Sequence, residues 1–312
     1  MVVTIVVLLI LAGVSISLIL DNNGIIKKSK DARKEYKQAQ ANEQADLDNA
    51  SKWIDDVISN KVEPENISDW GYTEEEDGTI TINTYKGSDT TVIIPNYING
   101  KPVKKIECDN YVVGYDKNSI WDSNICADNF QTYWKEQKTI KKIIISEGIE
   151  NIGDDAFVAS VGLENIIIPN SVISIGQSAF WGCIELTSIT IPSSVTTIGK
   201  RAFQGCTGLT NITIPSSVTT IEYNTFFGCT GLTNITIQNG VISIGKTAFW
   251  GCTELTSITI PNSVTTMGYG VFENIPSITV NVPFKKGETP EGWNANWNGT
   301  NNNCLVTVNY LK

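Results

Sequence analysis

A block of 23 residues repeats along the middle of this chain with its apolar positions almost unchanged. Residues 186–208 read LTSITIPSSVTTIGKRAFQGCTG and residues 209–231 read LTNITIPSSVTTIEYNTFFGCTG, so mainly the polar residues differ. The same template begins again at residues 140, 163, 232 and 255. Self-similarity at a fixed period of about 20 to 50 residues is typical of solenoids. We call each copy a coil and number the six coils from residue 140.

Within one coil, the apolar positions predict a short half-buried strand that ends in a turn. In coil 3, Ile189 and Ile191 flank Thr190, and Pro192 ends the strand because it has no N–H to donate. Burying about seven side chains at roughly 2 kcal/mol each does not offset roughly 1 to 2 kcal/mol of backbone entropy per residue. We therefore expect the coils to fold only by stacking, with strands about 4.8 Å apart in one continuous sheet.

The coil consensus, L-x-x-I-x-I-P-x-x-V-x-x-I-G-x-x-A-F-x-x-C, resembles the BspA-like, or Treponema-type, leucine-rich repeat of bacterial surface proteins. The resemblance covers residues 80–310 and is most specific over residues 163–274. It implies a mainly β leucine-rich repeat solenoid on the cell surface, with adhesin-like binding of a protein or glycan. Where the general leucine-rich repeat has a buried Asn, we expect a cysteine ladder to fill part of the space, formed by Cys183, Cys206, Cys229 and Cys252.

The ladder cysteines have two alternative states. Stacking would bring neighbouring ladder cysteines to about 5 Å between Cα atoms, which is within the range of a disulfide. Their Cβ vectors would run parallel, however, and a buried thiol is a good small core residue. We expect buried free thiols, with a disulfide between neighbours as the alternative.

The residue composition argues against catalysis and against a nucleic-acid partner. The chain has no histidine, which removes Ser-His-Asp and Cys-His nucleophiles and most zinc and iron sites. Its seven cysteines lack the close pairs of zinc motifs, and no two repeat acids are forced together at glycosidase spacing. We expect no enzyme activity, catalytic residue, metal or cofactor. A net charge of −10 disfavours binding to nucleic acid.

The first 64 residues differ from the coils in composition. Residues 1–20 carry no charge and would form a helix about 30 Å long, enough to cross a bilayer. Residues 21–64 have apolar residues at helical spacing, which predicts an amphipathic helical stalk. The basic stretch of this stalk contacts either lipid headgroups or solvent. We therefore expect a long N-terminal α-helix with a membrane-spanning first half.

The apolar segment resembles the first helix of type IV pilin-like proteins. This resemblance implies self-association through the helix and an alternative function as a structural subunit of a surface filament. Six basic residues between residues 27 and 37 follow the span and would favour a cytoplasmic location for that side. The repeat resemblance implies the opposite, and we expect the repeat domain to lie outside the cell.

The repeats are flanked by an irregular region on each side. Residues 65–139 are expected to form an entry coil and an aromatic insertion, with strands at 79–82 and 91–95 and a turn at Asn99-Gly100. Residues 140–274 hold the leucine-rich repeats. Residues 275–312 are the expected C-terminal cap, in which residues 276–280 form a strand and Trp293 and Trp297 close the stack.

Two groups of aromatic residues are candidates for ligand binding. One is a row just before the Gly-Cys of the coils, Trp181, Phe227 and Trp250, where coil 3 has Gln204. The other lies in the insertion and consists of Trp121, Tyr133 and Trp134. The alternative is structural in both cases: the row seals the core edge, or the insertion caps the stack.

The sheet should also carry an outward row of threonines, formed by Thr190, Thr213, Thr236 and Thr259, which we attribute to β-propensity. Together these features predict a membrane-anchored, non-catalytic cell-surface protein that binds a protein or glycan ligand.

Overall fold

The computed structural model describes residues 61–108, 139–299 and 305–310, all within the compact unit Asn60–Lys312. The expected helix of residues 1–20, nearly all of the stalk and most of the aromatic insertion lie outside the described residues. One short 3-10 helix, η1 (Ile67–Asp69), is the only helix in the described part of the chain. None of the described residues belongs to a helix long and apolar enough to cross a membrane.

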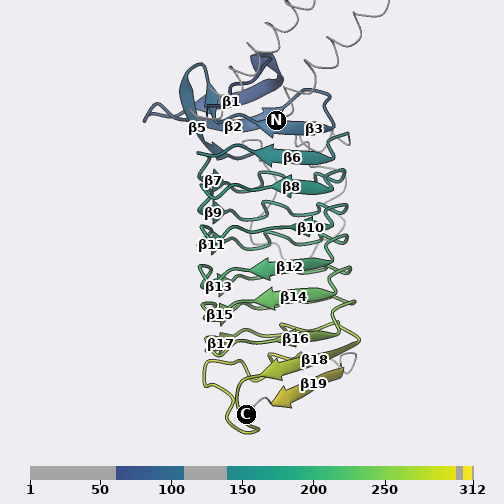
Figure 1. Cartoon of the computed structure of the whole chain (residues 1–312). Helices are drawn as coiled ribbons and strands as arrows, with labels where there is room; N and C mark the ends of the chain where they lie inside the picture. The colour runs from purple at the N-terminus through teal and green to yellow at the C-terminus, as the bar shows by residue number, and fades with distance from the viewer. Residues whose placement is uncertain (1–60, 109–138, 300–304, 311–312) are drawn as a thin grey trace, which may run out of the picture. The chain divides into compact units, whose positions relative to one another are not determined.

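The described residues form a stack of coils with two strand-bearing faces (Figure 1). The first face holds β3 (Thr91–Ile94), β6 (Lys142–Ile145), β8 (Asn165–Ile167), β10 (Ser188–Ile189), β12 (Asn211–Ile214), β14 (Asn234–Ile237), β16 (Ser257–Thr259), β18 (Ser277–Val282) and β19 (Leu305–Tyr310). The second face holds β1 (Trp70–Glu74), β2 (Ile80–Tyr85), β5 (Lys101–Ile106), β7 (Asn151–Ile152), β9 (Ser174–Ile175), β11 (Thr197–Ile198), β13 (Thr220–Ile221), β15 (Ser243–Ile244) and β17 (Thr266–Met267). These findings confirm the mainly β repeat solenoid.

The region before coil 1 contains more strand than the sequence predicts. The two expected strands are present as β2 and β3, but they belong to different faces: β2 pairs with β1 and β5, whereas β3 pairs with β6. The expected turn at Asn99-Gly100 joins β4 (Tyr97–Ile98) to β5, and both residues have positive φ angles, 52° and 75°. After coil 6, the expected strand is β18, and β19 adds a further parallel strand.

The core consists of identical side chains stacked from coil to coil. One fully buried phenylalanine per coil forms an inner row, made of Phe157, Phe180, Phe203, Phe226, Phe249 and Phe272. Neighbouring rings are stacked with centroids 5.3 to 5.8 Å apart. At the C-terminal end, Trp297 packs edge-on against the last ring, and Trp293 is 6% exposed. The two tryptophans therefore close the stack as the sequence predicts.

The four ladder cysteines are buried free thiols. Each Sγ–H donates to the carbonyl of the inner-row phenylalanine in the preceding coil, at Sγ–O distances of 3.0 to 3.2 Å. Burial raises the pKa of Cys183 and of Cys229 to about 12. The disulfide alternative is not formed, and the thiols serve as small core residues that satisfy a backbone carbonyl.

The expected single continuous sheet is wrong, because each face is interrupted once. On the first face, β14 ends a six-stranded sheet and β16 begins the next one. On the second face, the first sheet ends at β11, and β13 begins the next. The coils remain stacked across both interruptions, so the breaks are local openings between neighbouring strands.

The second-face break has a steric cause. Five coils have glycine after the second-face strand, and a Cβ at Gly199 would lie 2.5 Å from the carbonyl carbon of Gly176 and the nitrogen of Gln177. Coil 4 has Glu222 at this position. Since a side chain cannot occupy that space, the backbone of coil 4 is held away from coil 3, and β11 and β13 do not pair.

The first-face break lies where coil 5 departs from its neighbours. Coil 5 has Gln238-Asn-Gly240 where coils 3 and 4 have Pro-Ser-Ser. The N–H of Gln238 donates to the carbonyl of Ile214 at 3.1 Å, and its Oε1 accepts from the N–H of Ser216 at 3.0 Å. Gly240 has φ 135°, and a Cβ there would lie 2.1 Å from the Ser216 carbonyl oxygen. The end of β14 is thus bound closely to coil 4, and its other edge opens toward β16.

Candidate functional site

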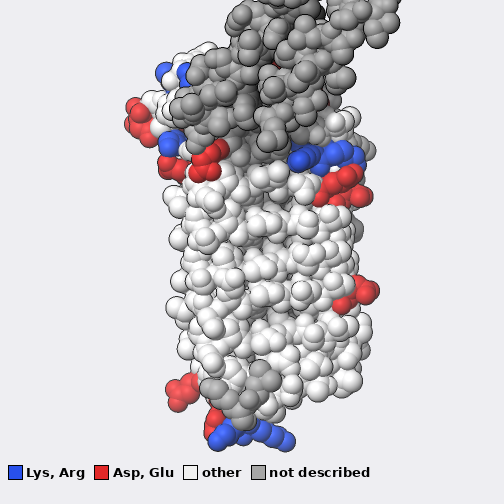
Figure 2. Space-filling model, in the orientation of Figure 1, with Lys and Arg blue, Asp and Glu red and all other residues white. Residues whose placement is uncertain are grey.

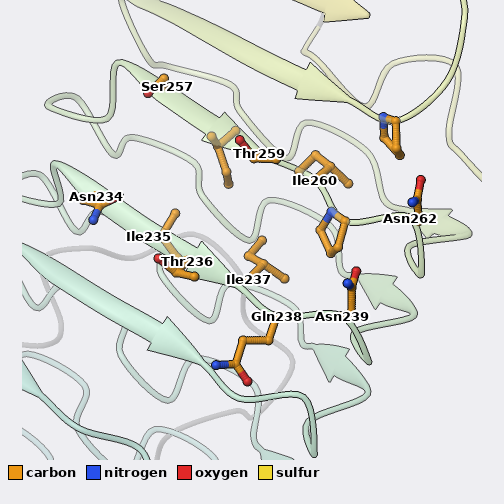
Figure 3. Close-up of a pocket in the computed structure, with 13 residues that line it drawn as sticks. Asn234, Ile235, Thr236, Ile237, Gln238, Asn239, Ser257, Thr259, Ile260 and Asn262 are labelled. Atoms are coloured by element: carbon orange, nitrogen blue, oxygen red, sulfur yellow. The ribbon is translucent and has the colours of Figure 1, made fainter. Parts of the chain in front are cut away.

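An open groove of about 660 Å³ lies at the first-face break, between coils 5 and 6 (Figure 3). This volume is typical of small-ligand sites, which range from about 300 to 1,000 Å³. The groove is lined by Asn234, Ile235, Thr236, Ile237, Gln238, Asn239, Ser257, Ile258, Thr259, Ile260, Pro261, Asn262 and Pro283. It therefore follows the whole length of β14 and β16 and includes the turns after them.

Alternation along the two strands determines the chemistry of the groove. Asn234 and Thr236 of β14 and Ser257 and Thr259 of β16 are exposed, because residues at every second position of a strand point outward. The isoleucines between them are buried in the core but also line the groove. The site thus combines outward amides and hydroxyls with aliphatic side chains.

The turns after the two strands add further amides to the groove. Asn239 and Asn262 follow β14 and β16 and lie one above the other in Figure 3. The side-chain amides of Asn234, Asn239 and Asn262 make no hydrogen bond to any other residue in the described part of the chain. Their donors and acceptors are therefore available to a ligand.

No charged side chain lines the groove. On the face that Figure 2 shows, lysines, arginines and acids gather mainly toward the two ends of the stack, with a broad uncharged surface between them. The ion pairs among the described residues all lie at the N-terminal end, for example Lys104 with Glu150 and Lys141 with Glu164. The groove is consequently suited to a neutral ligand.

The predicted aromatic row is half-buried. Phe227 and Trp250 stack with centroids 4.3 Å apart and an interplanar angle of 7°. Each ring therefore covers one face of the other. Trp181 is also half-buried. The candidate residues Trp121, Tyr133 and Trp134 lie outside the described residues.

Gln204 interrupts the aromatic row in coil 3. Its Oε1 atom is buried and has no hydrogen-bond partner within the described residues. A buried acceptor without a partner costs free energy, so this glutamine is unfavourable where an aromatic ring would stack. None of the row residues lines the groove. The structure therefore does not bring the row and the groove together.

The groove was not anticipated from the sequence, apart from the outward positions of Thr236 and Thr259. The signal that could have found it is the change from Pro-Ser-Ser to Gln-Asn-Gly in coil 5. In a stack of nearly identical coils, a departure of three consecutive residues marks a place where neighbouring coils meet differently. The amide side chains are visible in the sequence, but the opening between β14 and β16 is not.

The described residues contain no group of three or more His, Cys, Asp or Glu side chains placed to hold a metal ion. The buried ladder thiols are also poor nucleophiles, because the raised pKa keeps them protonated at neutral pH. The arrangement of the described residues is thus suited to binding through hydrogen bonds and apolar contacts.

Comparison with solved structures finds several leucine-rich repeat proteins of low sequence identity. A T. pallidum leucine-rich repeat protein is 21% identical, with 61% of this chain and 89% of that chain covered and a TM-score of 0.45. A leucine-rich repeat protein from Bacteroides ovatus is 23% identical, with 77% and 66% covered and a TM-score of 0.35. The pneumococcal vaccine antigen PcpA is 17% identical, with 78% and 49% covered and a TM-score of 0.37.

No curated protein sequence matches this chain. A family match, described as the BspA type leucine rich repeat region in six copies, covers residues 129–230 and 173–289, which together are more than half of the 312 residues. The coil consensus, the stacked inner row and this match agree, and the chain belongs to the BspA-type leucine-rich repeat family.

Proposed function

We propose that this protein is a non-catalytic cell-surface binding protein whose leucine-rich repeat stack captures a protein or glycan ligand in the groove between coils 5 and 6. The observation that carries the proposal is the groove itself. It opens where coil 5 departs from the repeat, and three exposed side-chain amides around it have no partner among the described residues. Core packing does not require an amide at the position of Asn239 and Asn262, because coils 3 and 4 stack with Ser193 and Ser216 there.

The distribution of polar groups supports binding rather than catalysis. The groove contains no titratable side chain, so it has no general acid, general base or nucleophile apart from unactivated hydroxyls. The cysteines of the repeats are buried and protonated. A rigid stack with hydrogen-bonding groups on its surface is the usual form of a repeat-protein binding surface.

The proposed location is the outer surface of the cell, with residues 1–20 as the membrane anchor. Their lack of charge and their length support the anchor, and the family to which the chain belongs supports an exposed repeat domain. The half-buried row of Trp181, Phe227 and Trp250 is the proposed second contact region for a bulky ligand. This row lies outside the groove, so its contribution can be tested separately.

An array of proteins and glycans probed with the purified full-length protein tests the binding function. The informative variant is a coil swap, Gln238→Pro with Asn239→Ser and Gly240→Ser, which gives coil 5 the turn of coils 3 and 4. We expect the native chain to capture a ligand and the swap to lose most of that capture while its Tm stays close to native. Thr213→Ala, the coil 4 counterpart of Thr236, is the control and should bind normally.

Two results would oppose this proposal. Failure of the native chain to capture any protein or glycan would remove the binding function. Equal capture by the native chain and the coil swap would remove the groove as its site, and the triple variant Trp181→Gln, Phe227→Gln and Trp250→Gln would then show whether the aromatic row binds. Protease treatment of intact cells should release the repeat domain, and its survival until lysis would contradict the surface location.

A further inference from the structure

We infer that the groove between coils 5 and 6 takes a short, neutral oligosaccharide. This inference rests on the proposed binding function and specifies its ligand class. It follows from three properties of the groove: a high density of side-chain amides and hydroxyls, an aliphatic lining, and the absence of charged and aromatic side chains from that lining.

Hydrogen-bonding capacity is the first property. A primary amide places an acceptor oxygen and a donor nitrogen side by side, so it can accept from one hydroxyl and donate to another. Four amides line this single groove, from Asn234, Gln238, Asn239 and Asn262, and three exposed hydroxyls lie between them. Sugar rings carry adjacent hydroxyls that are both donors and acceptors. The groove therefore offers the donors and acceptors that the hydroxyls of a glycan can bond to.

The hydrogen bonds that these amides already make determine which groups remain for a ligand. Gln238 already uses its Oε1 to accept from Ser216, so it offers a ligand its Nε2–H donors. Asn234, Asn239 and Asn262 retain both functions, because their amides bond to no other described residue. The Thr259 hydroxyl oxygen accepts from Asn281 at 3.2 Å, which leaves its own O–H to donate. The groove thus offers donors and acceptors in mixture, as a polyhydroxylated ligand requires.

The aliphatic part of the lining is the second property. Four isoleucines and two prolines line the groove together with the polar groups. Sugars have C–H surfaces between their hydroxyls, and these surfaces gain free energy when they displace water from aliphatic side chains. The four residues of β14, at about 3.3 Å each, give a groove roughly 13 Å long, with the turns extending it further. The dimensions suit an extended chain of a few sugar units.

The missing groups disfavour the other ligand classes. Protein interfaces usually depend on aromatic or arginine anchors, and the groove has neither. A sialylated or sulfated glycan, or any other anion, would require a positive charge, and no lysine or arginine lines the groove. A neutral glycan needs none of these groups.

Isothermal titration of the full-length protein with defined trisaccharides tests the inference. The neutral probes are maltotriose, cellotriose, mannotriose and tri-N-acetylchitotriose, and sialyllactose is the anionic probe. We expect at least one neutral trisaccharide to bind and sialyllactose not to bind. Because no charged group takes part, the affinity should not change with salt concentration. A strong salt dependence would contradict a neutral ligand held by amides.

Single substitutions then locate the bound sugar. Asn239→Ala and Asn262→Ala each remove one amide from an exposed turn, and each should weaken binding about three- to tenfold, the usual effect of one lost hydrogen bond. Thr213→Ala in coil 4 is the matched control and should leave the affinity unchanged. Since these residues are exposed, the variants should fold normally, which a thermal melt checks.

The outcomes separate this inference from the proposed function. If no neutral trisaccharide binds, or if the groove variants bind as well as the native chain, the glycan inference is overturned. If the array yields a peptide or protein ligand that the coil swap no longer captures, the binding function stands and only the ligand class is wrong. If the array captures nothing, both are removed.

Discussion

The inner phenylalanine row and the aromatic row next to it differ by one position in the sequence but follow different rules. The inner row has the same residue in all six coils, and every ring is fully buried and stacked on the ring of a neighbouring coil. The outer row has Val158, Trp181, Gln204, Phe227, Trp250 and Glu273 in the same order of coils. Its residues range from buried to half-buried.

The difference between the two rows shows at which positions stacking restricts the residue type. An inner position is enclosed by the same residue of the coils above and below, so a change in one coil disturbs three. Four of the six outer positions are only half-buried, and the outer row holds several different residue types. Variation along the chain therefore lies on the surface, where binding residues can be selected without loss of the fold.

The largest expected effect comes from breaking the inner row. Phe203→Ala should lower the free energy of unfolding by about 3 to 5 kcal/mol, because it leaves a cavity between two stacked rings. Thermal or urea denaturation of the full-length protein measures the loss. Thr190→Ala on the exposed face is the control and should change stability by less than about 0.5 kcal/mol. Similar small losses in both variants would contradict the importance of the inner row.

The second effect concerns the cysteines that bond to the inner row. Burial raises the pKa of Cys183 and Cys229 from 9.0 to about 12. A thiol with a higher pKa in the folded state stabilises the fold at low pH and loses that contribution as the pH rises through this interval. We expect Tm to fall between pH 9 and pH 12. Cys229→Ala should show a shallower fall, and an unchanged slope would exclude this thiol as a contributor.

The third test makes the outer row resemble the inner one. Gln204→Phe removes the buried acceptor that has no partner among the described residues and allows a ring to stack on Phe227, as Trp250 does on its other side. Removing this acceptor and adding the ring contact should together raise the free energy of unfolding by about 1 to 3 kcal/mol. Gln204→Ala, which removes the acceptor but adds no ring, should gain less. A less stable Gln204→Phe variant would show that this position cannot accept a ring.

The smallest effect concerns the position after the second-face strand, at which coil 4 differs from the other coils. Glu222→Gly restores the residue found in the other coils and should let β13 pair with β11, with a gain of about 1 kcal/mol. Glu222→Ala keeps the Cβ and should show no gain. Hydrogen exchange at the amide of residue 222 provides the local readout, because the equivalent amide of Gly199 donates to the carbonyl of Ile175 in the preceding strand. No slowing of exchange in the glycine variant would mean that the break has another cause.

The sequence by itself determined the repeat unit and its stacking. The periodic apolar positions give the half-buried strands, the proline ends them, and the phenylalanine and cysteine positions become inner ladders because each coil must bury them against the next. The closing tryptophans, Trp293 and Trp297, could also be predicted, since the last coil needs a cover. The predictions for residues 1–60 and for the aromatic insertion remain predictions.

Only the tertiary structure decided where the stack opens and which side chains meet there. Strands β2 and β3 are close in sequence but pair on different faces. Each pairs with the strand that follows it in the stack, β2 with β5 and β3 with β6. The breaks at Glu222 and Gln238 depend on whether a Cβ or an extra hydrogen bond fits between two backbones about 5 Å apart. A pattern of residue types fixes the position of a side chain within its coil but not the distance between coils. The groove is a consequence of that distance.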